Sequence, residues 1–294
     1  MTSPAPPPDP LVRLPSSYVD LPAGWERVSA DGPGPFVTSE TLRRPDGTLA
    51  KWRSRAHRKA GHAPFVTRWM AALFALGSAC FLVASVASQW ASTSRPAIGV
   101  VFFVGSLLFT AAAYLQYGEV VNVHREPGRR ARRLRLRPAS WEPKRIDWLA
   151  GSIQLIGTLL FNVSTFLALQ HGLDARQADL RVWAPDAAGS VCFLVASALA
   201  YAEVCHRWWC LHRHSMSWWI VALNLTGAVA FGLAAIASLV EPSTDELVNV
   251  RIANAGTSLG AVCFLIGAIL LAPEATRATR SARPRSRAAP VRTP

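Results

Sequence analysis

The chain has 294 residues, of which 51% are hydrophobic and 17% are charged, and its formal net charge is +13. None of the 18 acidic residues lies in the middle of a long apolar run, and most of the 31 basic residues fall in three blocks. This separation indicates a membrane protein, because a charge inside hydrocarbon is costly. Basic blocks beside apolar spans are also what the positive-inside rule produces, so the net charge does not indicate a nucleic-acid partner.

Residues 1–64 are polar, rich in Pro and Gly, and then basic. We expect most of this segment to be disordered and cytoplasmic, because it has too little apolar surface for a core. It begins MTSPAPPPDP, without the basic start and apolar stretch of a signal peptide. Within it, TLRRPDGTLAKW (41–52) places Pro-Asp-Gly between two short runs, a sequence that predicts a small hairpin.

Six apolar spans follow, each close to the ~20 residues that a helix needs to cross the hydrocarbon of a bilayer. We predict an all-α polytopic membrane protein with transmembrane helices at 67–90, 97–117, 148–170, 184–204, 217–240 and 254–273. These spans pair into hairpins over 65–119, 147–205 and 217–275. A basic loop (120–146) and a short loop containing Cys and His (206–216) join the hairpins, and a basic tail (276–294) is expected to be disordered.

The connecting segments predict the orientation. The segment 118–146 holds nine Lys or Arg and the tail after 274 holds six Arg, whereas 91–96, 171–183 and 241–253 hold one, two and one. The positive-inside rule therefore places both termini in the cytoplasm and the protein in the plasma membrane as a multi-pass protein. We expect the basic segments to contact anionic lipid headgroups of the bilayer.

All six spans carry one pattern: Gly, a small residue, two free positions, Phe, two free positions and two small residues. It is clearest in GSACFLVAS (77–85), GSVCFLVAS (189–197) and GAVCFLIGA (260–268). Positions seven apart on an α-helix differ by about 20° in azimuth, so the small residues form a stripe. Such stripes let helices approach closely in lipid, which predicts a helix-packing motif with the Phe beside the stripe. Its residues are Gly77, Phe81, Gly105, Phe109, Gly157, Phe161, Gly189, Phe193, Gly227, Phe231, Gly260 and Phe264.

A second regularity groups the spans in pairs. Each odd span has a Trp eight or nine residues before its motif glycine, and each even span ends in a Glu fourteen residues after it: Glu119, Glu203 and Glu274. The unit is therefore a helical hairpin used three times in one orientation, which predicts a pseudo-threefold axis along the membrane normal. Two interpretations of the glutamates stay open: an acidic ring at the cytoplasmic mouth of a central path, or helix-end residues that pair with neighbouring Arg.

The hairpin, with its GSIQLIGTLLF and GSVCFLVAS helices, resembles the YrhK-like bacterial membrane proteins, and the longer actinobacterial members in particular. The resemblance covers about residues 66–275. It implies a bacterial plasma-membrane protein and brings no established activity or catalytic residues.

Two sets of residues are candidate ligands for a soft metal. Cys80, Cys192 and Cys263 occupy motif positions at one depth and could converge on the axis. We favour packing for them, because Cys behaves as a small buried hydrophobe and other spans carry Leu or Ala there. The loop between the fourth and fifth spans brings several metal-ligand types within ten residues, at a spacing that matches no standard zinc pattern. These are Cys205, His206, Cys210, His212 and His214.

Enzyme motifs are absent: there is no phosphate-binding loop, nucleophile elbow or His-Glu-x-x-His, and no carboxylate pair inside a span. We therefore expect a membrane protein that is not an enzyme and has no cofactor, built for helix packing and compatible with a homo-oligomer. A small-solute channel along the axis is the first alternative, and a metal or redox module at the Cys205–His214 loop is the second. A central cavity lined by Gln154, Asn224 and the three glutamates would favour the channel.

Overall fold

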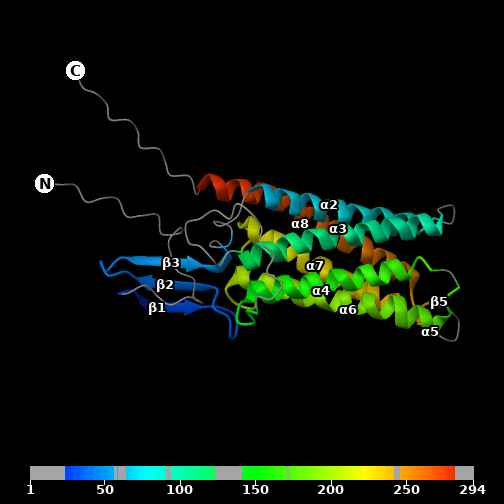
Figure 1. The fold of residues 1–294 in the computed structure, drawn as a ribbon, viewed down its shortest axis with the longest axis horizontal. Helices are drawn as coiled ribbons and strands as arrows, with labels where there is room; N and C mark the ends of the chain where they lie inside the picture. The colour runs from blue at the N-terminus through cyan, green and yellow to red at the C-terminus, as the bar shows by residue number, and fades with distance from the viewer. Residues whose placement is uncertain are drawn as a thin grey trace, which may run out of the picture.

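The computed structural model describes residues 24–55, 58, 64–90, 94–122, 141–170, 172–241 and 246–281. They form a bundle of long helices with a small sheet at one end (Figure 1). Residues 1–23 of the N-terminal segment, most of the basic loop at 120–146 and the tail from 282 lie outside the described residues.

Six helices are long and apolar enough to cross a membrane, as predicted. They are α2 (Pro64–Ala87), α3 (Arg95–Asn122), α4 (Ile146–Leu167), α6 (Ala184–Cys205), α7 (Met216–Ala237) and α8 (Val250–Ser281). The shortest have 22 residues, a length of about 33 Å at a rise of 1.5 Å per residue. This exceeds the ~30 Å thickness of bilayer hydrocarbon.

The largest differences from the predicted helix boundaries lie at two places. The segment 171–183 was expected to be a loop, but α5 (Ala175–Ala178) and the π-helical turn η1 (Asp179–Trp183) run directly into α6. Asp174 starts this extension by accepting a hydrogen bond from the backbone N–H of Gln177 at 2.7 Å. At the other end of the chain, α8 continues past Pro273 to Ser281, into the tail that was expected to be disordered. Hydropathy marks where apolar residues stop, whereas a helix can continue into water.

The helices form a closed ring. Helices α2 and α3, α4 and α6, and α7 and α8 pack as hairpins, and further contacts join α3 to α4, α6 to α7 and α8 to α2. Helices α2, α4 and α7 begin at the sheet end of the bundle, and α3, α6 and α8 lead back to it (Figure 1). A short two-stranded pair, β4 (Val240–Glu241) and β5 (Glu246–Leu247), lies at the opposite end.

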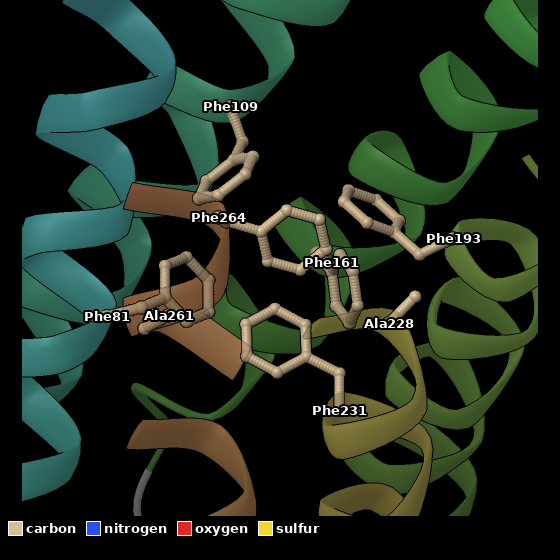
Figure 2. Packing of buried hydrophobic residues seen from close by; sticks show 8 residues of the cluster. All are labelled: Phe81, Phe109, Phe161, Phe193, Ala228, Phe231, Ala261 and Phe264. Atoms are coloured by element: carbon tan, nitrogen blue, oxygen red, sulfur yellow. The ribbon is translucent and has the colours of Figure 1, made fainter. Parts of the chain in front are cut away.

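The six motif phenylalanines, one from each helix of the ring, meet in a single cluster with Ala228 and Ala261 (Figure 2). Most of their rings contact edge to face, with centroids 5.6 Å apart for Phe81–Phe109 and 5.8 Å apart for Phe193–Phe264. This is the arrangement that aromatic quadrupoles favour. The side chains that the helices present outward are apolar too, including Leu76, Val104 and Ile236. Exposed Leu, Val and Ile on every side of a helical ring is the pattern expected for contact with lipid.

The N-terminal segment contains a three-stranded antiparallel sheet, so the expectation that it would be largely disordered was wrong for residues 26–53. Its strands are β1 (Glu26–Asp31), β2 (Ser39–Arg43) and β3 (Leu49–Arg53), in the order β1-β2-β3. The predicted hairpin over 41–52 is confirmed: β2 pairs with β3 across the Pro-Asp-Gly turn, where Gly47 has a φ of 81°. β1 is exposed along its whole length, so it carries no apolar alternation to indicate a strand.

The sheet docks on the ends of α4 and α6. Phe36 packs against a cluster that contains Ile146 and Leu199, and the Oγ1 of Thr38 lies 2.9 Å from the Nδ1 of His206. β3 then leads through Ser54 and Arg55 towards the start of α2. The sheet thereby places Ser54 and Arg55 at the end of the helical ring, beside Glu203 and Glu274.

Candidate functional site

A cavity of about 170 Å³ lies inside the ring, at the end nearest the sheet. All six helices line it, and each contributes a polar group: Thr67, Gln116, Gln154, Glu203, Asn224 and Glu274. Phe74 and Phe264 form its inner wall, where the cavity meets the phenylalanine cluster. An apolar cavity of about 150 Å³ is enough to hold benzene, so this volume accommodates a small solute.

The three glutamates predicted at a cytoplasmic mouth all lie in the wall of this cavity. Glu119, Glu203 and Glu274 are buried, with exposed fractions of 8%, 2% and 7%. Each accepts a hydrogen bond from a hydroxyl group: Thr67 to Glu119 at 3.1 Å, Ser54 to Glu203 at 2.9 Å, and Ser217 to Glu274. A buried carboxylate needs such donors, because an unpaired charge away from water is unfavourable.

Arginines from the segment before α2 reach into the same wall. The Arg58 guanidinium binds Glu203 with two hydrogen bonds of 3.0 Å and lies 3.1 Å from Asp147 Oδ2. Burial alone would lower the pKa of Arg58, but its attraction to Glu203 and Asp147 outweighs burial and raises that pKa above its ordinary value. Arg55 lies 3.5 Å from Glu274. The two interpretations of the glutamates thus meet here, since the carboxylates line a cavity and also pair with Arg.

Asp147 was missed by the sequence analysis, which began the third span at residue 148. Its carboxylate receives Arg145 Nε at 3.1 Å and Nη2 at 2.7 Å, besides the contact from Arg58. Arg145 also donates to Glu142 at 2.8 Å. These attractions outweigh burial and raise the pKa of Arg145. A signal for this position exists: Asp147 stands ten residues before Gly157, as Thr67 and Ser217 stand ten residues before their motif glycines.

Amide groups complete the polar wall. Gln116 Nε2 donates to Gln154 Oε1 at 3.0 Å, which also ties α3 to α4. Asn224 lies against Gly267, where an added Cβ would be only 2.6 Å from the amide oxygen, so a glycine is needed there to leave room for the amide. Gln154, Asn224 and all three glutamates therefore line the cavity. This is the lining that the sequence predicted for a small-solute channel.

Beyond the cavity, the motif glycines lie face to face within each hairpin. A Cβ built at Gly77 would lie 2.8 Å from Phe109 Cδ2 and 3.0 Å from the carbonyl oxygen of Gly105. The pairs Gly157 with Gly189 and Gly227 with Gly260 show the same approach. Each phenylalanine ring thus covers the glycine of the neighbouring helix, which brings the two backbones close together.

The three motif cysteines do not converge. The Cβ of Cys80 packs against Gly105, that of Cys192 against Gly157 and that of Cys263 against Gly227. Each cysteine therefore belongs to a different hairpin interface, and the motif phenylalanines fill the centre between them. This is the packing role that the sequence analysis favoured over a three-thiol metal site.

The loop between α6 and α7 differs from the prediction, which treated its cysteines as separate ligands. Cys205 and Cys210 form a disulfide. His206 turns to Thr38, and His214 is exposed. Within the described part of the chain, Cys205, Cys210 and His212 are the one group with metal-ligand atoms close together, all within 4.8 Å of one another. His212 Nδ1 lies 3.0 Å from Cys210 Sγ.

Comparison of the chain with known protein families, curated proteins and solved structures finds no match.

Proposed function

We propose that the protein is a facilitator for a small cationic solute in the plasma membrane, with the cavity as its binding site and the axis of the helical ring as its path. The observation that carries this proposal is a polar cavity, built by all six membrane-length helices, inside a bundle with an apolar exterior. Ionisable groups inside a membrane bundle are costly, and they commonly mark the pathway of a substrate or ion.

The proposed orientation places the cavity on the cytoplasmic side, with both termini in the cytoplasm. The unequal distribution of Lys and Arg among the connecting segments supports it. The three-hairpin repeat and the YrhK-like assignment belong to the same proposal. Equal spacing of cavity residues from the motif glycines supports the repeat, since Glu119, Glu203 and Glu274 each follow a glycine by fourteen residues.

The substrate class follows from the way the site holds Arg58. Two carboxylates, Glu203 and Asp147, bind its planar guanidinium at 3.0–3.1 Å. Four carboxylates and two arginines line the cavity, so acidic groups outnumber basic ones there, and a solute that carries a guanidinium or ammonium group would find charge-assisted acceptors of the kind that hold Arg58. The proposed substrates are therefore small organic cations that fit a volume of about 170 Å³, such as methylammonium and guanidinium.

The phenylalanine cluster serves as the gate in this proposal. Its rings meet across the ring of helices, for example Phe109 with Phe264 at 6.0 Å and Phe161 with Phe231 at 6.2 Å. Hydrophobic constrictions close channels by excluding water. Passage of a solute therefore requires these rings to rotate or the hairpins to separate.

The test uses the full chain reconstituted in vesicles, with uptake of methylammonium and guanidinium measured by stopped-flow light scattering. Ala200→Phe adds a ring to the cavity wall. Ala111→Phe adds the same ring on the exposed side of α3 and is the matched control. We expect uptake above that of empty vesicles, reduced at least tenfold by Ala200→Phe and unchanged by Ala111→Phe. Equal uptake in the two variants, or no uptake of either cation, would overturn the facilitator and leave a membrane protein built for packing.

A further inference from the structure

The loop between α6 and α7 brings two sulfur atoms and one imidazole together at the sheet end of the bundle. The disulfide joins Cys205, the last residue of α6, to Cys210, and His212 Nδ1 lies 3.0 Å from the sulfur of Cys210. Thiolate sulfur and imidazole nitrogen are the ligands that Zn²⁺ and other thiophilic ions prefer. None of these three groups lines the cavity.

Hydrogen bonds to the backbone fix the shape of this loop without help from the disulfide. The carbonyl oxygen of Cys210 accepts from Trp218 Nε1 at 3.1 Å and from the hydroxyl of Tyr201. The carbonyl oxygen of His212 accepts from the backbone N–H of Ser215 at 2.9 Å. Reduction of the disulfide would therefore leave Cys210 and His212 near Cys205, rather than release the loop.

The distances suit a tetrahedral ion. Bonds of about 2.3 Å to sulfur and about 2.0 Å to nitrogen hold neighbouring ligand atoms roughly 3.5–3.8 Å apart. The ligand atoms of Cys205, Cys210 and His212 already lie within 4.8 Å of one another. The two sulfurs need only to separate from a bond of about 2 Å to about 3.8 Å. Three protein ligands leave the fourth position of the ion for water or another exchangeable ligand.

We propose that Cys205 and Cys210 are a reversible dithiol–disulfide pair, and that the reduced pair binds a thiophilic divalent ion together with His212. Reduction adds two electrons and two protons to the disulfide, and a dithiol reductant supplies both as it becomes a disulfide itself. Binding of the ion then displaces the two thiol protons. The orientation proposed above places this loop in the cytoplasm, where thiols are kept reduced and such spacings more often bind metal.

The test uses the full-length protein in detergent, reduced, freed of reductant without oxygen, and titrated with Co²⁺ as a spectroscopic probe for Zn²⁺. We expect one equivalent of Co²⁺ with tetrahedral absorption and a sulfur-to-metal charge-transfer band, and Zn²⁺ should displace it. Cys210→Ser and His212→Ala should weaken binding at least tenfold, whereas His212→Cys, which keeps a ligand, should retain it. Cys192→Ser and His214→Ala are matched controls and should bind as the wild type does.

A second measurement separates loss of the site from loss of the fold. Each variant is first checked for a single peak in gel filtration, and thiols are then labelled with maleimide. In the reduced native protein, Zn²⁺ should protect Cys205 and Cys210 and leave the labelling of Cys80 unchanged. Equal Co²⁺ binding by reduced wild type and Cys210→Ser, no binding by the reduced protein, or a disulfide that native protein never releases to a dithiol would each overturn the proposal. These outcomes do not depend on whether vesicles take up a cation.

Discussion

The contact between the motif glycines of α7 and α8 gives the sharpest test of the packing. A Cβ built at Gly260 would lie 2.4 Å from Phe231 Cδ1 and 2.9 Å from the carbonyl oxygen of Gly227. Carbon atoms in favourable contact are about 3.5–4.0 Å apart, so Gly260→Ala requires the ring to move by about 1 Å. The ring has little room, since Phe264 and Phe81 lie against it with centroids 5.3 and 5.9 Å away.

Overpacking of a well-packed interior costs about 1–3 kcal/mol, and replacing a helical Gly by Ala returns up to about 1 kcal/mol. Gly232→Ala, inside the partner helix α7, provides the matched control because nothing lies within 4 Å of a Cβ built there. The helix-propensity gain is the same in both variants, so their difference reports the contact. We expect Gly260→Ala to unfold with a free energy about 1–3 kcal/mol lower than that of Gly232→Ala.

The assay is thermal unfolding of detergent-solubilised protein, followed by tryptophan fluorescence. At roughly 2–4 °C per kcal/mol for a chain of this size, Gly260→Ala should melt about 2–12 °C below Gly232→Ala. Combining Gly260→Ala with Phe231→Leu should recover part of the loss, because the shorter side chain removes the ring edge that clashes. Equal melting temperatures for the two single variants would refute the close approach of α7 and α8 at this glycine.

Three further outcomes are expected. Phe193→Ala should lower the free energy of unfolding by about 3–5 kcal/mol, because this ring is buried in the central cluster. In vesicles the same variant should raise uptake of the proposed cations, and unchanged uptake would contradict the proposal that the phenylalanine cluster is the gate. Arg58→Gln should lower the free energy of unfolding by about 3–5 kcal/mol in a denaturation series, because it leaves the buried carboxylate of Glu203 without its guanidinium partner. Arg43→Gln, which breaks an exposed pair with Glu26, should lower it by less than about 1 kcal/mol. Burial and the nearby charge of Arg53 lower the pKa of His206. The unfolded chain therefore binds a proton at this histidine at a higher pH than the folded protein does, and the free energy of unfolding should fall as pH drops below about 6.5. His206→Asn, which tolerates the left-handed φ of 57°, should make the melting temperature less dependent on pH in that range, and an unchanged pH dependence would contradict the role given to His206.

The sequence was sufficient to predict the six long helices, because a run of about twenty apolar residues indicates a helix that spans a membrane. The glycine and phenylalanine spacing also indicated which helix faces pack, although it did not show that all six rings would meet in one cluster. That outcome depends on the closed ring, which joins α8 back to α2, a long-range contact with no local signature. The strand β1 was missed because it is exposed along its whole length, so its sequence has no alternation of apolar and polar residues.

One residue of the cavity wall, Asp147, was not predicted from its own span, although an alignment of the three odd-numbered spans would have identified it. Asp147 lies one residue before the span predicted at 148–170 and was therefore not considered among the polar residues of that span, yet it binds both Arg58 and Arg145. Asp147 precedes Gly157 by ten residues in the sequence, as Thr67 and Ser217 precede their own motif glycines, and those two hydroxyls each donate to a cavity glutamate.

In the second hairpin the corresponding position carries the carboxylate of Asp147, which cannot donate to Glu203 when both are ionised. A cation between the two carboxylates is then required, and Arg58 supplies it. The departure of one hairpin from the other two therefore explains why an arginine from outside the ring enters the cavity wall, and why that wall has the chemistry to hold a cation.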